Sequence, residues 1–168
     1  MAHLKLFDAG RIMKATYDIT NDADVMMRID IRGVQAVYLR DGTLVIPGTN
    51  EFTDWFEFNL DLMPGAESSH GFSVIAGDSG AHWHAGFLEH AQTVYAFAKP
   101  LRPKFIIGHS LGAASAQIVG MSLRVPTIGF ASPRTHRGSN RLTGEGWVVN
   151  ICRTDDTVCH VPPNFMGF

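Results

Sequence analysis

The stretch that decides the fold is Lys104-Phe105-Ile106-Ile107, followed directly by Gly108-His109-Ser110-Leu111-Gly112. The second part matches the G-x-S-x-G pattern, which carries a nucleophile only where a strand precedes it and a helix follows. Both are predicted here: residues 104–107 form a short apolar strand, and residues 111–124, rich in Ala, Gly and Ser, form a helix. The sequence therefore predicts a sharp strand-to-helix turn with Ser110 at its apex.

The chemistry of such a turn follows from its geometry. A Cβ atom at either flanking glycine would crowd the neighbouring strand and helix, so Gly108 and Gly112 are needed for packing. The Ser110 hydroxyl is expected above a helix N-terminus, where partial positive charge favours a developing anion. The Leu111 N–H points the same way and is one expected oxyanion donor. The alternative, a Gly- and Ser-rich turn without chemistry, is disfavoured by the strand and helix on either side.

The elements outside this turn indicate a mostly parallel α/β sheet. Two β-rich runs, Val34–Leu39 and Thr43–Ile46, flank Asp41-Gly42, a strong hairpin signal. Alternating strands and helices predict right-handed crossovers within one domain, residues 1–168. The other expected elements are a helix over residues 1–20, a loop over 61–82 with a strand at Phe72–Ile75, a helix from His84 to Lys99 stopped by Pro100, and strands at 126–130 and 147–151.

Composition narrows the functional classes. The chain has 168 residues, of which 45% are hydrophobic and 18% charged, which excludes a disordered chain or a coiled coil. The 14 Lys+Arg and 16 Asp+Glu give a net charge of −2 without a basic stripe, so a nucleic-acid partner is not expected. No apolar run is long enough to span a membrane, and no signal peptide is visible. These features favour a cytoplasmic location, with secretion not excluded.

Four separated blocks carry a resemblance to the class 3 lipases of the α/β-hydrolase superfamily. They occur in the family's order and span residues 45–163. The resemblance implies an α/β-hydrolase-like fold, with a mixed, mostly parallel sheet, helices on both faces and a missing C-terminal end. The blocks are Pro47–Trp55 with Asn59-Leu60, Trp83–Phe87, Ile107–Ala114, and a fourth region made of Gly129–Arg134 and Arg153–Pro163.

The resemblance also implies the site. Ser110 would be the nucleophile, Thr49 would join Leu111 as an oxyanion donor, and Asp156, four residues before His160, would be the acid. Asp155 is the competitor for the acid role, separated from Asp156 only by register. The implied activity is hydrolysis of acylglycerols or simple acyl esters through an acyl-enzyme, without a metal or an organic cofactor. The family's Arg is replaced by Pro47 here, which removes a local ion pair but not the oxyanion role.

The general base is not evident. The family's catalytic His lies beyond the last residue of this chain, and none of the eight histidines stands in its position. His160, four residues after Asp156, ranks first as a replacement, and His136, on a loop near the expected active-site edge, ranks second. Three interpretations stay open: a truncated lipase, an enzyme with a displaced histidine, or a hydrolase-fold interaction module without catalysis. Loss of the last strand and helix would expose a sheet edge, which could favour a homodimer.

Two further segments have alternative interpretations. Residues 51–59 map onto the family's lid, and Phe52, Trp55 and Phe56 would share one helical face that could contact a lipid interface transiently. An ordinary core helix is an equal alternative. Cys152 and Cys159 bracket the expected acid and could form a disulfide, but two reduced thiols are the favoured prediction for a cytoplasmic chain.

Overall fold

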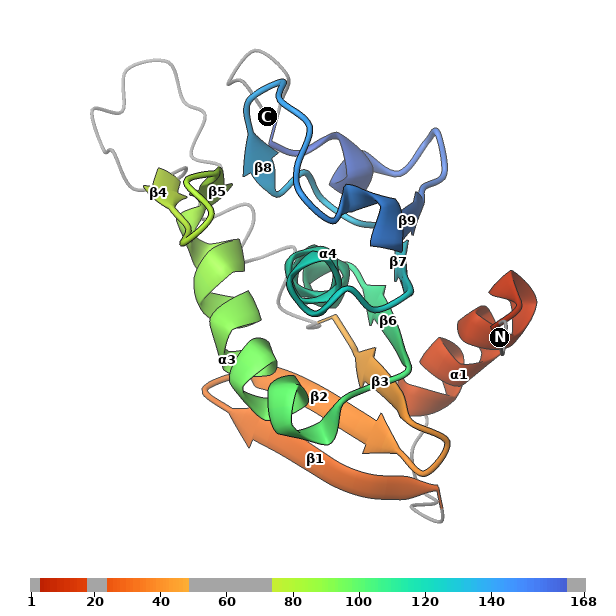
Figure 1. Ribbon diagram of the computed structural model, residues 1–168. Helices are drawn as coiled ribbons and strands as arrows, with labels where there is room; N and C mark the ends of the chain where they lie inside the picture. The colour runs from red at the N-terminus through yellow and green to blue at the C-terminus, as the bar shows by residue number, and fades with distance from the viewer. Residues whose placement is uncertain (1–3, 18–23, 49–73, 163–168) are drawn as a thin grey trace.

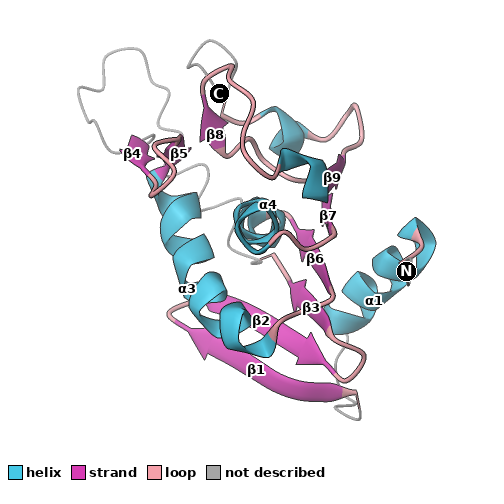
Figure 2. Cartoon of the chain, viewed as in Figure 1, coloured by secondary structure: helices cyan, strands magenta, loops and turns pink. Residues whose placement is uncertain are grey.

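The computed structural model describes residues 4–17, 24–48 and 74–162. Its centre is a six-stranded sheet with the order β1-β2-β3-β6-β7-β9 (Figures 1 and 2). Within this sheet, β3, β6, β7 and β9 run parallel, whereas β2 is antiparallel to both β1 and β3. The strands are β1 (Val25–Ile31), β2 (Val34–Leu39), β3 (Thr43–Ile46), β6 (Phe105–His109), β7 (Thr127–Phe130) and β9 (Val148–Ile151).

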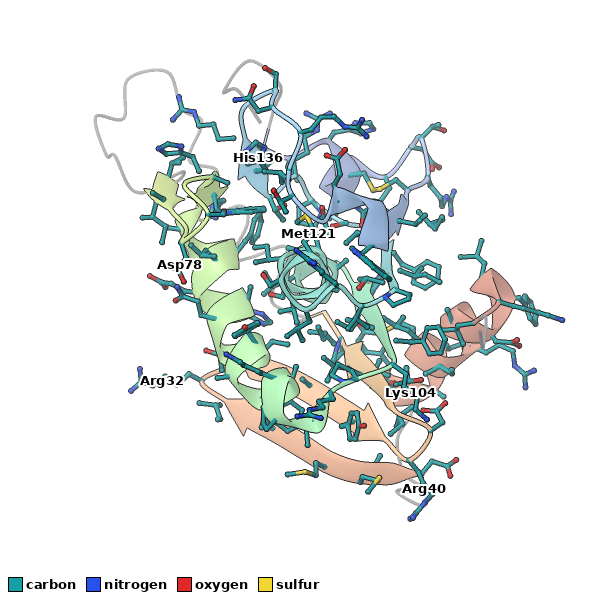
Figure 3. All side chains as sticks on the ribbon, viewed as in Figure 1. Arg32, Arg40, Asp78, Lys104, Met121 and His136 are labelled. Carbon is teal, nitrogen blue, oxygen red and sulfur yellow. A yellow bond between two sulfur atoms is a disulfide. The ribbon has the colours of Figure 1, made fainter. Side chains whose placement is uncertain are left out.

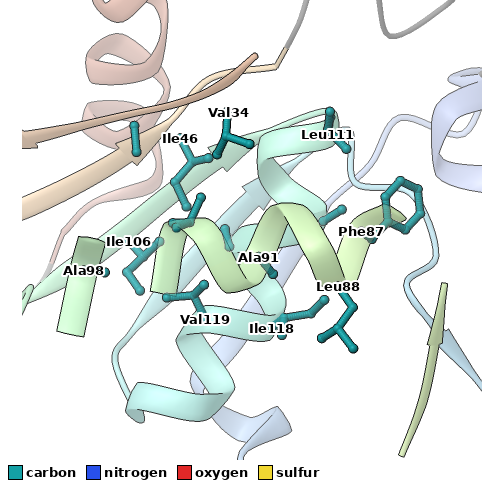
Figure 4. Packing of buried hydrophobic residues seen from close by; sticks show 14 of the residues in the cluster. Val34, Ile46, Phe87, Leu88, Ala91, Ala98, Ile106, Leu111, Ile118 and Val119 are labelled. Atoms are coloured by element: carbon teal, nitrogen blue, oxygen red, sulfur yellow. The ribbon is translucent and has the colours of Figure 1, made fainter. Parts of the chain in front are cut away.

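Helices cover both faces of this sheet, as the sequence predicts. Helices α3 (Ala85–Leu101) and α4 (Leu111–Leu123) pack on the face formed by Leu44, Ile46 and Ile106 (Figure 4). Helix α1 (Leu6–Tyr17) packs on the opposite face, where Ala9 and Met13 join the alternate strand residues Val45 and Ile107. Because successive strand residues point to opposite faces, one apolar run in β3 and one in β6 supply both cores.

The predicted hairpin is present. Gly42 follows Asp41 in the turn between β2 and β3 and has a φ of +94°, a backbone conformation that glycine adopts without steric cost. The Asp41 carboxylate accepts the N–H of Thr43 at 2.8 Å and closes the turn. Strand β1, which was not predicted, pairs with β2 in regular antiparallel register from Met27 to Ile31, after a register shift between Val25 and Met27.

Helix α3 corrects one prediction. Pro100 does not stop the helix but lies inside its last turn, and the helix continues to Leu101. At that position the missing N–H of proline removes a single helical hydrogen bond, near a helix end whose last carbonyl groups have no helical donor in any case. The helix ends at Arg102, which has a left-handed conformation and donates its N–H to the Ala98 carbonyl.

A smaller antiparallel sheet lies beside the N-terminal end of α3. It has the order β4-β5-β8, with strands β4 (Val74–Ala76), β5 (His82–His84) and β8 (His136–Arg137). The strand predicted at Phe72–Ile75 corresponds to β4. Two 3-10 turns, η1 (Glu145–Trp147) and η2 (Thr157–His160), flank β9 and complete the described elements. None of the described helices is long and apolar enough to cross a membrane.

Candidate active site

Ser110 occupies the turn between β6 and α4. Its φ of 53° and ψ of −123° lie in a region that L-residues rarely adopt, and only 8% of the residue is exposed. Its N–H donates to the Phe130 carbonyl of β7 at 2.9 Å, and its carbonyl accepts from Ala113 at 2.9 Å. The strained backbone is therefore held from the sheet and from the helix at once, as an elbow requires.

The two flanking glycines are required by packing. A Cβ on Gly108 would lie 2.5 Å from the Gly112 carbonyl oxygen and 2.6 Å from the Ala113 Cα. A Cβ on Gly112 would overlap the carbonyl oxygens of Ile46 and Pro47 at the end of β3. Real Cβ atoms do not approach backbone this closely, so any side chain at either position would force β6, α4 and β3 apart.

Leu111 begins helix α4. The first amides of an α-helix have no intrahelical acceptor, and the helix dipole adds partial positive charge at this end. Ala113 and Ala114 both donate to the Ser110 carbonyl, at 2.9 and 3.2 Å, so the helical hydrogen-bond pattern starts after Leu111. The Leu111 N–H therefore belongs to the first turn of α4, directly after the serine, and its role as an oxyanion donor stays a prediction.

Gly48 brings the end of β3 against the serine. A Cβ on this glycine would lie 2.9 Å from the Ser110 Cβ and 3.0 Å from the His109 carbonyl oxygen. The backbone of position 48 can therefore approach the nucleophile only because it carries no side chain. Thr49, the predicted second oxyanion donor, and the predicted lid at residues 51–59 lie outside the described residues.

His109 points to the α1 side of the sheet. Its Nδ1 lies 2.7 Å from the Tyr17 hydroxyl, and the two rings meet edge to face at 5.6 Å. Burial lowers the pKa of His109, and the negative charge of Asp156 partly opposes that shift. The same hydroxyl accepts the Gly48 N–H at 2.6 Å. Burial raises the pKa of Tyr17, and the Gly48 hydrogen bond acts in the opposite direction.

The two adjacent aspartates have different surroundings. Asp155 forms an exposed ion pair with Arg153, whose Nη2 lies 2.7 Å from its Oδ2. Asp156 is half-buried, and its Oδ1 accepts the Val158 N–H at 3.0 Å at the start of η2. The negative charge of Asp156 raises the pKa of His109, the residue before the serine, against the larger effect of burial. The assignment of Asp156 as the acid stays a prediction.

Neither candidate histidine contacts Ser110 among the described residues. His160 is exposed, and its Nε2 lies 3.3 Å from the Thr154 carbonyl oxygen. His136 belongs to β8 in the small sheet (Figure 3), where its ring packs against Trp83 at 5.4 Å. Burial lowers the pKa of His136, a Gly138 backbone hydrogen bond opposes this, and the nearby His82 lowers it further. The assignment of the base therefore stays a prediction.

The cysteine prediction is wrong. Cys152 and Cys159 are joined by a disulfide with a Cα–Cα distance of 6.1 Å, not reduced as the sequence favoured. The bond encloses Asp156 in a short loop. Arg134 holds the residues that follow this loop: its backbone N–H donates to the Val161 carbonyl at 2.8 Å and its Nη1 to the Pro162 carbonyl at 3.2 Å. In the part of the chain that the structure describes, no group of His, Cys, Asp and Glu side chains could hold a metal ion.

Comparison with known proteins supports the fold. No family model matches the chain, and no curated protein matches it. A solved structure does: a fungal lipase–inhibitor complex described as a model for interfacial activation in lipases, with 20% identity and a TM-score of 0.61. The match covers 90% of this chain and 65% of that lipase, so this chain spans less than two thirds of its length. The chain thus has a lipase-like α/β-hydrolase fold.

The sequence analysis missed Tyr17 and Gly48 as neighbours of the nucleophile. Gly48 lies inside a block that resembles the lipases, but only the following threonine drew a functional interpretation. Tyr17 ends the first helix, 92 residues before its partner His109, and no pattern in the sequence links the two. An unusual polar aromatic at a helix end is a weak signal, and only the fold gives it meaning.

Proposed function

We propose that this chain carries the acyl-transfer site of a carboxylic ester hydrolase of the lipase or esterase type. The observation that carries the proposal is Ser110, a non-glycine residue with positive φ at a strand-to-helix junction, beside the first amides of α4. A serine is held in this conformation at a cost in backbone energy, and such strain is concentrated at functional sites. The four lipase-like blocks support membership of the class 3 lipases.

The reaction follows from these positions. Ser110 Oγ attacks the ester carbonyl carbon while a general base accepts its proton, and the carbonyl oxygen becomes an oxyanion held by the N–H groups of Leu111 and Thr49. The tetrahedral intermediate collapses, the C–O bond breaks, and the alcohol leaves with the proton from the base. Water then attacks the acyl-enzyme by the same steps in reverse and releases the acid. Asp156 orients the base and stabilises its charged form.

The identities of the general base and of the substrate are also proposed. His160, four residues after Asp156, is the first candidate for the base, and His136 is the second. Acylglycerols and simple acyl esters are the proposed substrates. Apolar side chains at β9, Val149 at 56% and Ile151 at 37% exposure, support a homodimer as a further proposal.

A second function is favoured by one observation. Among the described residues, neither His136 nor His160, the two candidates for the base, forms a hydrogen bond with Ser110 Oγ, and a serine without a base stays protonated. The competing proposal is therefore a hydrolase-fold interaction module that no longer catalyses. Residual catalysis by a triad without one member is about 10³–10⁴-fold over water, which distinguishes an impaired enzyme from an inert one.

The test is covalent labelling of the full chain with a fluorophosphonate probe, followed by mass mapping. An enzyme is expected to label at Ser110, and Ser110→Ala is expected to abolish the label. Ser122→Ala removes a hydroxyl from the same helix and is expected to label like the wild type. Added imidazole can supply a base, so a rate that rises with imidazole only in the presence of Ser110 would show an intact nucleophile lacking its own base. A folded wild type that never labels, even with imidazole, would favour the interaction module.

A further inference from the structure

We propose that Tyr17 is a positioning residue for acyl transfer at Ser110, because its hydroxyl ties the end of β3 to the end of β6. The inference rests on the function proposed above. Its basis is one oxygen with two partners on different strands. The Tyr17 hydroxyl lies 2.6 Å from the Gly48 nitrogen and 2.7 Å from His109 Nδ1. No other described side chain makes hydrogen bonds to both of these strand ends.

The direction of the Gly48 hydrogen bond is set by its donor: a backbone N–H can only donate, so the tyrosine oxygen accepts it. The direction of the second bond depends on the histidine tautomer. An unprotonated Nδ1 accepts the hydroxyl proton, whereas a protonated Nδ1 donates to the second lone pair of the same oxygen. In either tautomer the hydroxyl is bonded to both groups, and phenylalanine can make neither bond.

Both partners adjoin the nucleophile. His109 directly precedes Ser110, and the Gly48 backbone is packed so closely against the serine that a Cβ there would lie 2.9 Å from the Ser110 Cβ. A shift in either strand end would therefore change the distance between the attacking oxygen and the backbone that leads into position 49. Misplacements of about 1 Å can cost about 10²-fold in rate.

The hydroxyl is not needed to hold α1 on the sheet. The buried contacts of the helix come from Ala9 and Met13, at 0% and 5% exposure, whereas Tyr17 is 46% exposed. These two residues belong to the cluster with Val45 and Ile107 and lie one and two turns before the tyrosine. Loss of the hydroxyl should leave the helix in place and change mainly the alignment of the strand ends.

The experiment compares Tyr17→Phe with Tyr38→Phe in the full chain. Tyr38 also uses its hydroxyl once, donating to the Leu101 carbonyl at 3.1 Å, on β2 and away from the elbow. Fluorophosphonate labelling of Ser110 is followed at several probe concentrations to separate the maximal rate from the probe affinity, with imidazole added to every sample. Hydrogen exchange of the Gly48 amide and the thermal midpoint are measured in parallel.

For Tyr17→Phe, we expect a fall of about tenfold in the maximal labelling rate, unchanged probe affinity and faster exchange at Gly48. For Tyr38→Phe, we expect wild-type labelling and wild-type exchange at Gly48. A merely structural role for Tyr17 would lower the thermal midpoint of Tyr17→Phe and leave its maximal labelling rate unaltered.

The outcomes separate the two proposals. If the wild type labels at Ser110 and Tyr17→Phe labels equally fast, the positioning role is overturned and the hydrolase proposal stands. If a folded wild type does not label at all, the hydrolase proposal fails and the catalytic role of Tyr17 fails with it. If Gly48 exchange is the same in the wild type and in Tyr17→Phe, the tether itself is absent.

Discussion

The two halves of the candidate site are built in opposite ways. The elbow, residues 105–123, is enclosed by its own sheet and by α3, and most of its side chains are buried. The acid loop, residues 152–162, is mostly exposed and is held by a disulfide, a helix cap and the Arg134 hydrogen bonds. Close packing fixes Ser110, the proposed nucleophile, whereas discrete cross-links fix the loop that contains Asp156, the proposed acid. The difference predicts that substitutions in the elbow destabilise the protein by steric overlap, whereas substitutions in the acid loop act by removing single bonds or charges.

The largest expected effect concerns the charge in the acid loop. Asp156→Asn keeps an oxygen that can cap η2, because Asn caps as well as Asp, but removes the negative charge. If Asp156 orients the base, ester hydrolysis should fall by roughly 10²–10⁴-fold with little change in the free energy of unfolding. Steady-state kinetics on a soluble ester and urea denaturation measure the two quantities.

The neighbouring carboxylate is the matched control. Asp155→Asn removes an exposed ion pair with Arg153, and such pairs contribute about 0–1 kcal/mol. Hydrolysis should stay within about twofold of wild type, because this carboxylate faces solvent. A larger loss in Asp155→Asn than in Asp156→Asn would reverse the assignment of the acid.

The next effect concerns packing in the elbow. Gly112→Ala places a Cβ into the carbonyl oxygens of Ile46 and Pro47 and should destabilise the protein by about 3 kcal/mol or more. Gly146→Ala, in η1, meets nothing within 4 Å and should change the free energy of unfolding by less than about 0.5 kcal/mol. Urea denaturation of both variants decides the point. Equal stabilities would show that β3 and α4 are not in contact as described.

A buried histidine gives the elbow a pH dependence. His90 of α3 lies 2.6 Å from Ser115 Oγ of α4, and burial lowers its pKa to about 4. The unfolded chain binds this proton near pH 6.5 and the native chain does not, so stability should fall between pH 6.5 and pH 4 by about 3 kcal/mol and level off below. Above pH 6.5 this contribution is fully present.

Urea midpoints between pH 7 and pH 4 test this histidine. The His90→Asn variant should be less stable at pH 7, and its stability should fall less steeply with falling pH than that of the wild type, because it lacks the proton uptake of His90 on unfolding. A wild-type slope in His90→Asn would mean that other groups account for the acid sensitivity.

The smallest of these stability effects belongs to the acid loop. The disulfide joins residues seven apart, and closing so short a loop restricts the unfolded chain by only about 2.5 kcal/mol. The double variant Cys152→Ser and Cys159→Ser should lose about this much, measured by thermal unfolding. Dithiothreitol should lower the midpoint of the wild type but not that of the double variant. An equal effect on both would indicate that the thiols are not paired in solution.

The same contrast explains how far the sequence could predict the molecule. The elbow could be predicted because dense packing restricts which residues fit. The glycines at 108 and 112 and the Ala-rich helix that follows are the sequence pattern that this packing requires. The hairpin is readable because Asp41-Gly42 sets its own turn. Strand β1 could have been predicted too, because Met27, Ile29 and Ile31 alternate with two charged residues and the register shift lies ahead of them, between Val25 and Met27. The strands β5 and β8 are too short for any periodicity.

The acid loop is less readable because its contacts are long-range. The pairing of Cys152 with Cys159 depends on the distance between two turns, which the sequence does not reveal. The prediction of reduced thiols rested instead on the expected cytoplasmic location. The exposure that separates Asp155 from Asp156 is likewise a property of the folded loop, since the two carboxylates are identical in chemistry. Position 49 and the expected lid remain predictions, as does the identity of the base.

The first helix has a practical consequence for recombinant work. It presents Leu6 and Phe7 to solvent at its start, 49% and 76% exposed, and ends at the hydroxyl that meets Gly48 and His109. A fusion partner should therefore be joined before residue 4, so that this helix stays intact. A shortened version that begins after residue 17 would strip Met13 from the sheet and free two strand ends, so a loss of function in such a version would say nothing about Ser110.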